Sequence, residues 1–184
     1  MPSSSSYISR PLVFPEVFNK VECAKLLEYA EAARMRPARL DGAWEGGRVS
    51  EVSWLDRDEP KVAWIVGRFR SLMKEANRSY RFDLSDVAPR LQFTRYDVGG
   101  TFNWHHDCDP EDYTTRKLTM LVMLSNTRDY SGGNLEVFPY GTLAFSQLLG
   151  AALIFPAFMF HRVTPVTHGV RNALVCWAEG RPFI

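Results

Sequence analysis

The chain has 184 residues, of which 46% are hydrophobic, 13% aromatic and 23% charged, a composition that indicates one globular domain and excludes a disordered or collagen-like protein. Its 22 basic and 21 acidic residues leave a formal net charge of +1, which argues against a broad basic face for nucleic acid. The three cysteines form no disulfide framework and no apolar stretch could cross a membrane, so we expect a cytoplasmic protein that contacts neither nucleic acid nor membrane.

The N-terminal part of the chain predicts a first helix over residues 19–36. Asn19 can cap this helix, because Glu22 stands three residues further on, where a capping box needs an acidic or amide side chain. Pro37 cannot continue a helix and therefore ends the run. The glycine-rich residues 41–48 then predict a loop.

A second helix is predicted to begin at Pro60, since proline fits the first turn of a helix. Apolar residues recur from Val62 to Ala76 at intervals of three and one, so they form a single stripe along the helix. A weakly alternating run over residues 49–55 predicts a strand before it. We expect the apolar stripe to cover a sheet rather than to meet a membrane or a partner helix.

The C-terminal half predicts many short strands with no helical pattern between them, which argues against parallel βαβ units. Helices followed by short strands favour a mainly β fold, a jelly roll with the N-terminal helices packed on one sheet. We expect a single domain over residues 1–184, with helical support at about 11–85 and a β core at about 86–184. The expected strands are Leu91–Tyr96, Thr101–Asp107, Leu118–Ser125, Asn134–Phe138, Ala151–Phe155, His161–Val166 and Asn172–Ala178.

Candidate metal ligands lie on the strand expected at Thr101–Asp107. Because side chains alternate in a strand, His105 and Asp107 share a polar face, and His106 faces the other way and is expected to pack or to meet solvent. His161 supplies a third candidate, since two imidazoles and a carboxylate form the facial set of non-haem Fe(II) oxygenases. Zinc hydrolases use the same set, so these residues alone do not choose the metal. The polar face comprises Thr101, Asn103, His105 and Asp107.

Arg171 stands ten residues after His161, on the strand expected next, where its guanidinium can point into the same cavity. A planar guanidinium suits a carboxylate, because it can donate two parallel hydrogen bonds. A metal triad beside a buried arginine has room for a 2-oxo dicarboxylic acid. The keto-acid end would chelate the metal and the distal carboxylate would pair with Arg171.

The C-terminal half carries, in this order, Tyr96-x-x-Gly99, His105-x-Asp107, the phrase Tyr130-Ser131-Gly132-Gly133-Asn134-Leu135, and His161-x9-Arg171. This set resembles the Fe(II)/2-oxoglutarate-dependent oxygenases, above all the prolyl 4-hydroxylase-like branch with the bacterial PKHD-type hydroxylases. The resemblance spans about residues 89–180 and implies a double-stranded β-helix, which is a jelly roll. It also implies Fe(II), 2-oxoglutarate and O2 as cofactors and cosubstrates, ascorbate as a supporting reductant, and succinate and CO2 as products.

The resemblance also implies roles for single residues. His105, Asp107 and His161 would be the iron ligands, and Arg171 would bind the distal carboxylate of 2-oxoglutarate. Tyr96 resembles a tyrosine that hydrogen-bonds the cosubstrate. Some relatives carry a further tyrosine on the strand expected at 118–125; this chain has Met123 there, and Thr119 on the same face is expected to add a hydroxyl.

The substrate pocket is expected to include Trp177, Asn103, Trp54 and Arg48. The expected reaction is hydroxylation of an unactivated C–H bond, either in a prolyl residue of a peptide or in an amino-acid-like small molecule. Two other classes stay open. One is a cupin-type metal-dependent isomerase or hydrolase, which would need neither the arginine nor 2-oxoglutarate, and the other is a non-catalytic sensor that keeps the fold.

Overall fold

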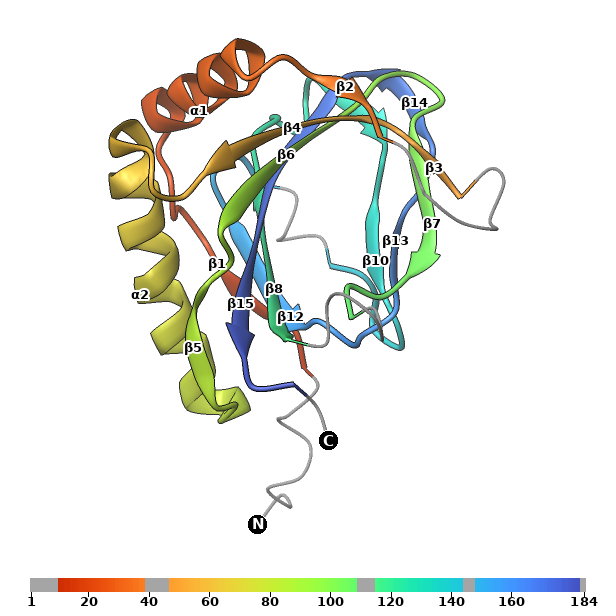
Figure 1. Cartoon of the computed structure of the whole chain (residues 1–184). Helices are drawn as coiled ribbons and strands as arrows, with labels where there is room; N and C mark the ends of the chain where they lie inside the picture. The colour runs from red at the N-terminus through yellow and green to blue at the C-terminus, as the bar shows by residue number, and fades with distance from the viewer. Residues whose placement is uncertain (1–9, 39–46, 109–114, 144–147, 183–184) are drawn as a thin grey trace.

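Two β-sheets face each other in the computed structural model, and two helices pack outside the larger sheet (Figure 1). The structure describes residues 10–38, 47–108, 115–143 and 148–182, so most of the loop expected at 41–48 lies outside the described residues. The mainly β architecture with N-terminal helices on one sheet confirms the fold class predicted from the sequence. No helix in the described residues is long and apolar enough to span a bilayer.

The larger sheet is antiparallel and carries the helices. The part of the chain before residue 86 adds strands to it as well as helices, so both parts of the chain build one layer. From edge to edge its strands are β1 (Leu12–Phe14), β12 (Ala152–Pro156), β8 (Arg116–Met123), β15 (Arg171–Gly180), β6 (Arg90–Tyr96), β4 (Glu51–Asp56) and β2 (Arg36–Pro37), and β5 (Leu84–Val87) also pairs with β15.

The smaller sheet lies opposite and completes the barrel seen in Figure 1. A separate two-stranded ribbon is formed by β9 (Tyr130–Gly132) and β14 (Val166–Gly169). The run His161–Val166, which we expected as one strand, is therefore split, because Pro165 has no N–H to continue a ladder. The smaller sheet contains β11 (Gly141–Thr142), β10 (Leu135–Val137), β13 (His161–Val163), β7 (Thr101–His105) and β3 (Arg48–Val49).

The first helix, α1 (Lys20–Ala32), begins as predicted. The Asn19 side chain accepts from the backbone N–H of Glu22, and the Glu22 side chain accepts from the N–H of Asn19, so the capping box is confirmed. The predicted end at residue 36 is wrong. The helix stops at Ala32 because Arg34 takes a left-handed conformation with φ 56°, which leaves Arg36–Pro37 free to form β2.

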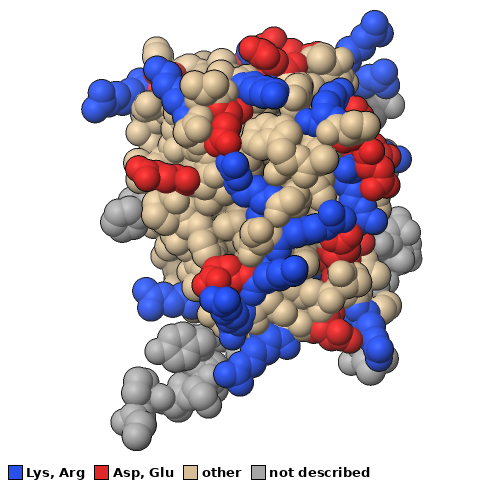
Figure 2. Space-filling model, turned by 90° about the vertical axis from the view of Figure 1, so that its left-hand side faces the viewer, with Lys and Arg blue, Asp and Glu red and all other residues tan. Residues whose placement is uncertain are grey.

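The second helix, α2 (Ala63–Tyr80), follows a short 3-10 turn, η2 (Pro60–Val62), at the predicted start. Its apolar stripe is buried against the larger sheet in the main hydrophobic core, as expected from its spacing. Figure 2 shows the face of the molecule on which this helix lies, where acidic and basic side chains are interspersed. The helix thus has one apolar face toward the sheet and one charged face toward solvent.

The packing of α2 gives a first testable prediction. Phe69 is fully buried in the stripe, so Phe69→Ala should lower the free energy of unfolding by about 3–5 kcal/mol, the usual cost of truncating a buried phenylalanine. Urea denaturation measures the change. Lys74→Ala on the exposed side of the same helix is the matched control and should change stability by less than about 0.5 kcal/mol. Equal effects of the two changes would contradict the buried position of the stripe.

Candidate metal centre

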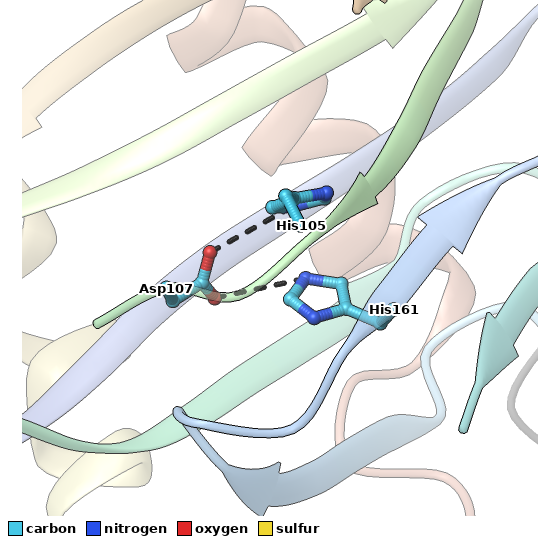
Figure 3. A group of neighbouring side chains, drawn as sticks. All are labelled: His105, Asp107 and His161. Atoms are coloured by element: carbon cyan, nitrogen blue, oxygen red, sulfur yellow. Dashed lines mark ion pairs between the residues drawn. The ribbon is translucent and has the colours of Figure 1, made fainter. Parts of the chain in front are cut away.

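Three side chains that can bind a metal converge inside the barrel at one end of the smaller sheet (Figure 3). His105 ends β7 and pairs across the strands with His161, which begins β13. Asp107 follows β7, and its backbone N–H donates to the carbonyl of Ala157 at 2.8 Å, which fixes the turn in front of β13. One ligand atom from each of the three residues lies within 4.8 Å of the others, so a single ion can contact all three.

Hydrogen bonds to the backbone set the tautomer of both histidines. The Nδ1 atom of His105 lies 2.7 Å from the carbonyl oxygen of Asn103, and Nδ1 of His161 lies 3.0 Å from that of Met159. A carbonyl can only accept, so each Nδ1 carries a proton, and in a neutral ring the Nε2 atom is then the one with a lone pair for a metal. Both Nε2 atoms face the Asp107 carboxylate at 3.8 Å (Figure 3), and burial lowers the pKa of His105, which keeps the ring neutral.

The Asp107 carboxylate is held by two donors from the opposite sheet. The Thr119 hydroxyl of β8 donates to Oδ2 at 2.6 Å, and the Trp177 indole N–H of β15 donates to the same atom at 3.0 Å. Burial by itself raises the pKa of Asp107, but the two histidines and these hydrogen bonds outweigh it, and the pKa falls to about 2. The carboxylate is therefore charged and fixed in orientation.

These contacts bear on three residues expected in the site from the sequence. Thr119 was expected at the distal carboxylate of a cosubstrate, but its hydroxyl is already bonded to Asp107. Trp177 does line the cavity, as expected, and its indole N–H also orients the carboxylate. Trp54 does not line the cavity; it stacks on the Trp177 ring with centroids 6.2 Å apart. The strand spacing that predicted a shared face could not indicate these bonds between the two sheets.

The predicted alternation along β7 is wrong at one place. Phe102 pairs with Val163 and His105 pairs with His161, so two residues of β7 oppose one residue of β13, which is a β-bulge. The bulge returns Phe102 to the face of His105, and the two rings stack with centroids 3.4 Å apart. Asn103 is consequently exposed, does not line the cavity, and accepts from the N–H of Trp104.

His106 directly follows β7 and is exposed, as expected, and its ring meets Phe160 edge-on with centroids 5.2 Å apart. The cavity next to the three ligands is walled by both sheets, and most of its wall is apolar or uncharged. Arg48 of β3 is the positively charged member of this wall. The lining residues are Arg48, Gln92, Thr94, Tyr96, Phe102, His105, Asp107, Thr119, Leu121, Leu135, His161, Val163, Val175 and Trp177.

Arg171 is 1% exposed and lies beside Tyr96, a residue of the cavity wall that is its partner across β15 and β6. Its Nε and Nη1 atoms have no hydrogen-bond partner within the described residues, and Nη2 contacts the Met123 sulfur at 3.5 Å. A buried guanidinium without a carboxylate partner is costly, so the arrangement suits an anion from outside the chain. Met123 thus faces the arginine, at the position where some relatives carry a tyrosine and this chain does not.

Tyr130 and Gly133 were not singled out as site residues from the sequence. The Tyr130 hydroxyl is buried without a partner in the described part of the chain, and burial raises its pKa while the Arg171 guanidinium opposes the rise. A Cβ on Gly133, where φ is +58°, would lie 2.9 Å from Arg171 Cδ and 3.5 Å from the Tyr130 ring, so the two side chains flank this glycine. The Tyr-x-Gly-Gly phrase that begins at Tyr130 was the sequence signal that could have identified these two residues.

The comparisons with known proteins agree with this geometry. The family model of the 2OG-Fe(II) oxygenase superfamily matches residues 91–179. A PKHD-type hydroxylase of a Caulobacter species is 40% identical over 179 residues, which cover 91% of this chain and 77% of the relative. A PKHD-type hydroxylase of Shewanella baltica is 30% identical over 177 residues, which cover 90% of this chain and 76% of the relative.

Solved structures show the same fold. A Pseudomonas putida prolyl-4-hydroxylase aligns with a TM-score of 0.75 at 19% identity, over 94% of each chain. A Trichoplax adhaerens prolyl hydroxylase in complex with a peptide fragment of the hypoxia inducible factor oxygen degradation domain aligns with a TM-score of 0.73 at 17% identity, over 96% of this chain and 88% of that one. At these identities the likeness concerns the fold alone.

Proposed function

The chain belongs to the 2OG-Fe(II) oxygenase superfamily and is an Fe(II)- and 2-oxoglutarate-dependent hydroxylase, and on this premise we propose that His105, Asp107 and His161 hold the iron. The observation that carries the assignment is that the Nε2 atoms of two histidines and one oriented carboxylate converge within 4.8 Å of one another. Bound iron, 2-oxoglutarate and O2 supply the oxidation of a C–H bond and leave succinate and CO2. The comparisons give no support to the cupin-type or sensor alternatives.

The guanidinium of Arg171, two of whose nitrogen atoms have no partner in the described residues, fits the cosubstrate. We propose that Arg171 binds the distal carboxylate of 2-oxoglutarate and that the hydroxyl of Tyr130 is a second donor to it. Within the described residues, three buried donors near Gly133 have no hydrogen-bond partner, namely Nε and Nη1 of Arg171 and the Tyr130 hydroxyl. One carboxylate can satisfy them, because it accepts several hydrogen bonds. Tyr96 lines the cavity directly beside Arg171 and is assigned to the same cosubstrate.

Tyr130→Phe tests this second donor. The change removes the hydroxyl and keeps the ring, so the dissociation constant of 2-oxoglutarate should rise by roughly ten- to a hundredfold, the value of one hydrogen bond to a charged group. Calorimetry on Mn(II)-loaded protein without oxygen measures it. Tyr29→Phe on α1 is the matched control and should leave the constant unchanged. Equal affinity in wild type and Tyr130→Phe would remove Tyr130 from the cosubstrate site.

The substrate binds, in this proposal, in the cavity walled by Phe102, Trp177 and Arg48. A prolyl residue of a peptide or an amino-acid-like molecule fits the likeness to PKHD-type hydroxylases and prolyl hydroxylases. A screen of peptides, amino acids and other metabolites tests it. The true substrate raises succinate formation and gains the mass of one oxygen, and a protein that never consumes 2-oxoglutarate would contradict the function.

We further propose that the chain works as one domain in the cytoplasm. Arg48 from the N-terminal part and the triad from the β core line the same cavity, so the two parts build this cavity together. Cys23 and Cys176 are buried free thiols, which suits a reducing compartment. The same compartment keeps iron ferrous, with ascorbate as a supporting reductant.

A further inference from the structure

Arg48 is fixed in the cavity wall by its surroundings. It lies on β3, the edge strand of the smaller sheet, and pairs with Phe102 on β7. Its guanidinium carbon lies 4.5 Å from the centroid of the Phe102 ring, and its Nε donates to the Ser50 hydroxyl at 2.7 Å. Because Phe102 itself stacks on His105, the guanidinium is attached to the wall that carries the metal ligands.

No carboxylate of the described residues forms an ion pair with Arg48. Burial lowers its pKa, and nearby Tyr96 and Asp107 oppose that effect. Asp107 lines the same cavity, but its Oδ2 already accepts from Thr119 and Trp177 and the carboxylate faces the two histidines. A guanidinium in this position is stabilised by an anion that enters the cavity.

The formal charges of the loaded site leave a place for such an anion. A divalent ion, the Asp107 carboxylate and the guanidinium groups of Arg48 and Arg171 together carry three positive charges when both histidines are neutral. The dicarboxylate cosubstrate neutralises two of them. One positive charge remains at the substrate side, in a cavity where charges are poorly screened.

The two arginines also lie on different sheets. Arg171 is on β15 of the larger sheet and Arg48 on β3 of the smaller one. Tyr96 lies between the two arginines and contacts both. Its ring centroid is 5.3 Å from the Arg171 guanidinium, and its hydroxyl interacts with Arg48. With the distal carboxylate at Arg171 and the keto-acid end at the metal, Arg48 is left for another ligand.

We propose that Arg48 binds a carboxylate of the primary substrate, which makes the substrate a small carboxylic acid such as a free amino acid, or a peptide hydroxylated at its own C-terminal residue. This inference rests on the proposed function and narrows it. An internal residue of a polypeptide has no carboxylate on its main chain and would leave the Arg48 charge without a partner.

The first experiment separates the two arginines by cosubstrate affinity. Calorimetry on Mn(II)-loaded protein without oxygen compares wild type, Arg48→Gln, Arg171→Gln and the control Arg90→Gln, an exposed arginine on β6. Arg48→Gln should keep the dissociation constant of 2-oxoglutarate within about threefold, whereas Arg171→Gln should raise it by more than about tenfold. A loss in Arg48→Gln as large as in Arg171→Gln would assign Arg48 to the cosubstrate and overturn the inference. Absent binding in wild type would instead overturn the proposed function.

The second experiment uses matched acids and amides. Free L-amino acids are compared with their carboxamides, and short peptides with free C-termini with their amidated forms, by the rise in succinate formation over the rate without substrate. At least one acid should stimulate about tenfold more strongly than its amide, and Arg48→Gln should remove this difference. Stimulation by free amino acids or only by peptides distinguishes the two sources of the carboxylate. If no acid exceeds its amide, or if the difference persists in Arg48→Gln, the inference is wrong.

Discussion

Replacing Asp107 by alanine is expected to lower 2-oxoglutarate turnover by roughly 100-fold or more, since even the groups that only orient a metal ligand are worth 10–100-fold. Asp107 supplies the one negative charge of the triad, and its carboxylate faces both imidazoles at 3.8 Å. His105→Ala and His161→Ala should have the same effect, because three protein ligands are what an open metal site needs. Succinate formation measures turnover, and calorimetry with Mn(II) measures metal affinity.

His106→Ala is the matched control for the triad. It removes an exposed imidazole that follows His105 in sequence and contacts Phe160, and it should reduce turnover by less than about threefold. Circular dichroism and the melting temperature should show that all four variants fold. If His106→Ala abolished metal binding while His105→Ala did not, the assignment of the metal ligands along β7 would be wrong.

Arg171→Ala is the second change with a large expected effect. Truncating one partner of a buried charge pair costs about 2–5 kcal/mol, so kcat/KM for 2-oxoglutarate should fall by at least about 30-fold. The arginine is 1% exposed and offers two nitrogen atoms without partners in the described residues, and the neutral Tyr130 hydroxyl cannot replace its charge at the distal carboxylate. Arg171→Lys should lose less, because it keeps the charge without the planar pair of donors.

A cosubstrate analogue without the distal carboxylate separates binding from folding in these variants. 2-Oxopentanoate keeps the keto-acid end, so wild type and Arg171→Ala should bind it with similar affinity to the Mn(II)-loaded protein. Arg171→Ala and Arg171→Lys should both keep the Mn(II) affinity of the wild type, since Arg171 is not a metal ligand. Equal losses for 2-oxoglutarate and 2-oxopentanoate would show that the change damages the cavity as a whole and would contradict the assignment.

The larger elements of the fold could be predicted because their signals are local. The capping box of Asn19 and Glu22, the apolar stripe from Val62 to Ala76 and the order of short strands depend on residues a few positions apart. The end of the first helix could not be predicted, because the residues of its expected last turn, Arg36–Pro37, pair with β4 as a strand instead. The spacing of residues along the chain predicts neither the end of α1 nor the strand with which β2 pairs.

The sequence by itself pointed to the reaction class, because two histidines, one aspartate and one arginine in this order, with the phrases around them, resemble one oxygenase family. The tertiary structure decided how that set is supported. The bulge in β7 exchanged Asn103 for Phe102, and the opposite sheet turned Thr119 and Trp177 onto Asp107. It also brought Tyr130 to Arg171 and Arg48 to the metal side of the cavity. Spacing along one strand predicts which residues share a face, but strand register and the approach of two sheets depend on packing between distant segments, and only the folded chain fixes them.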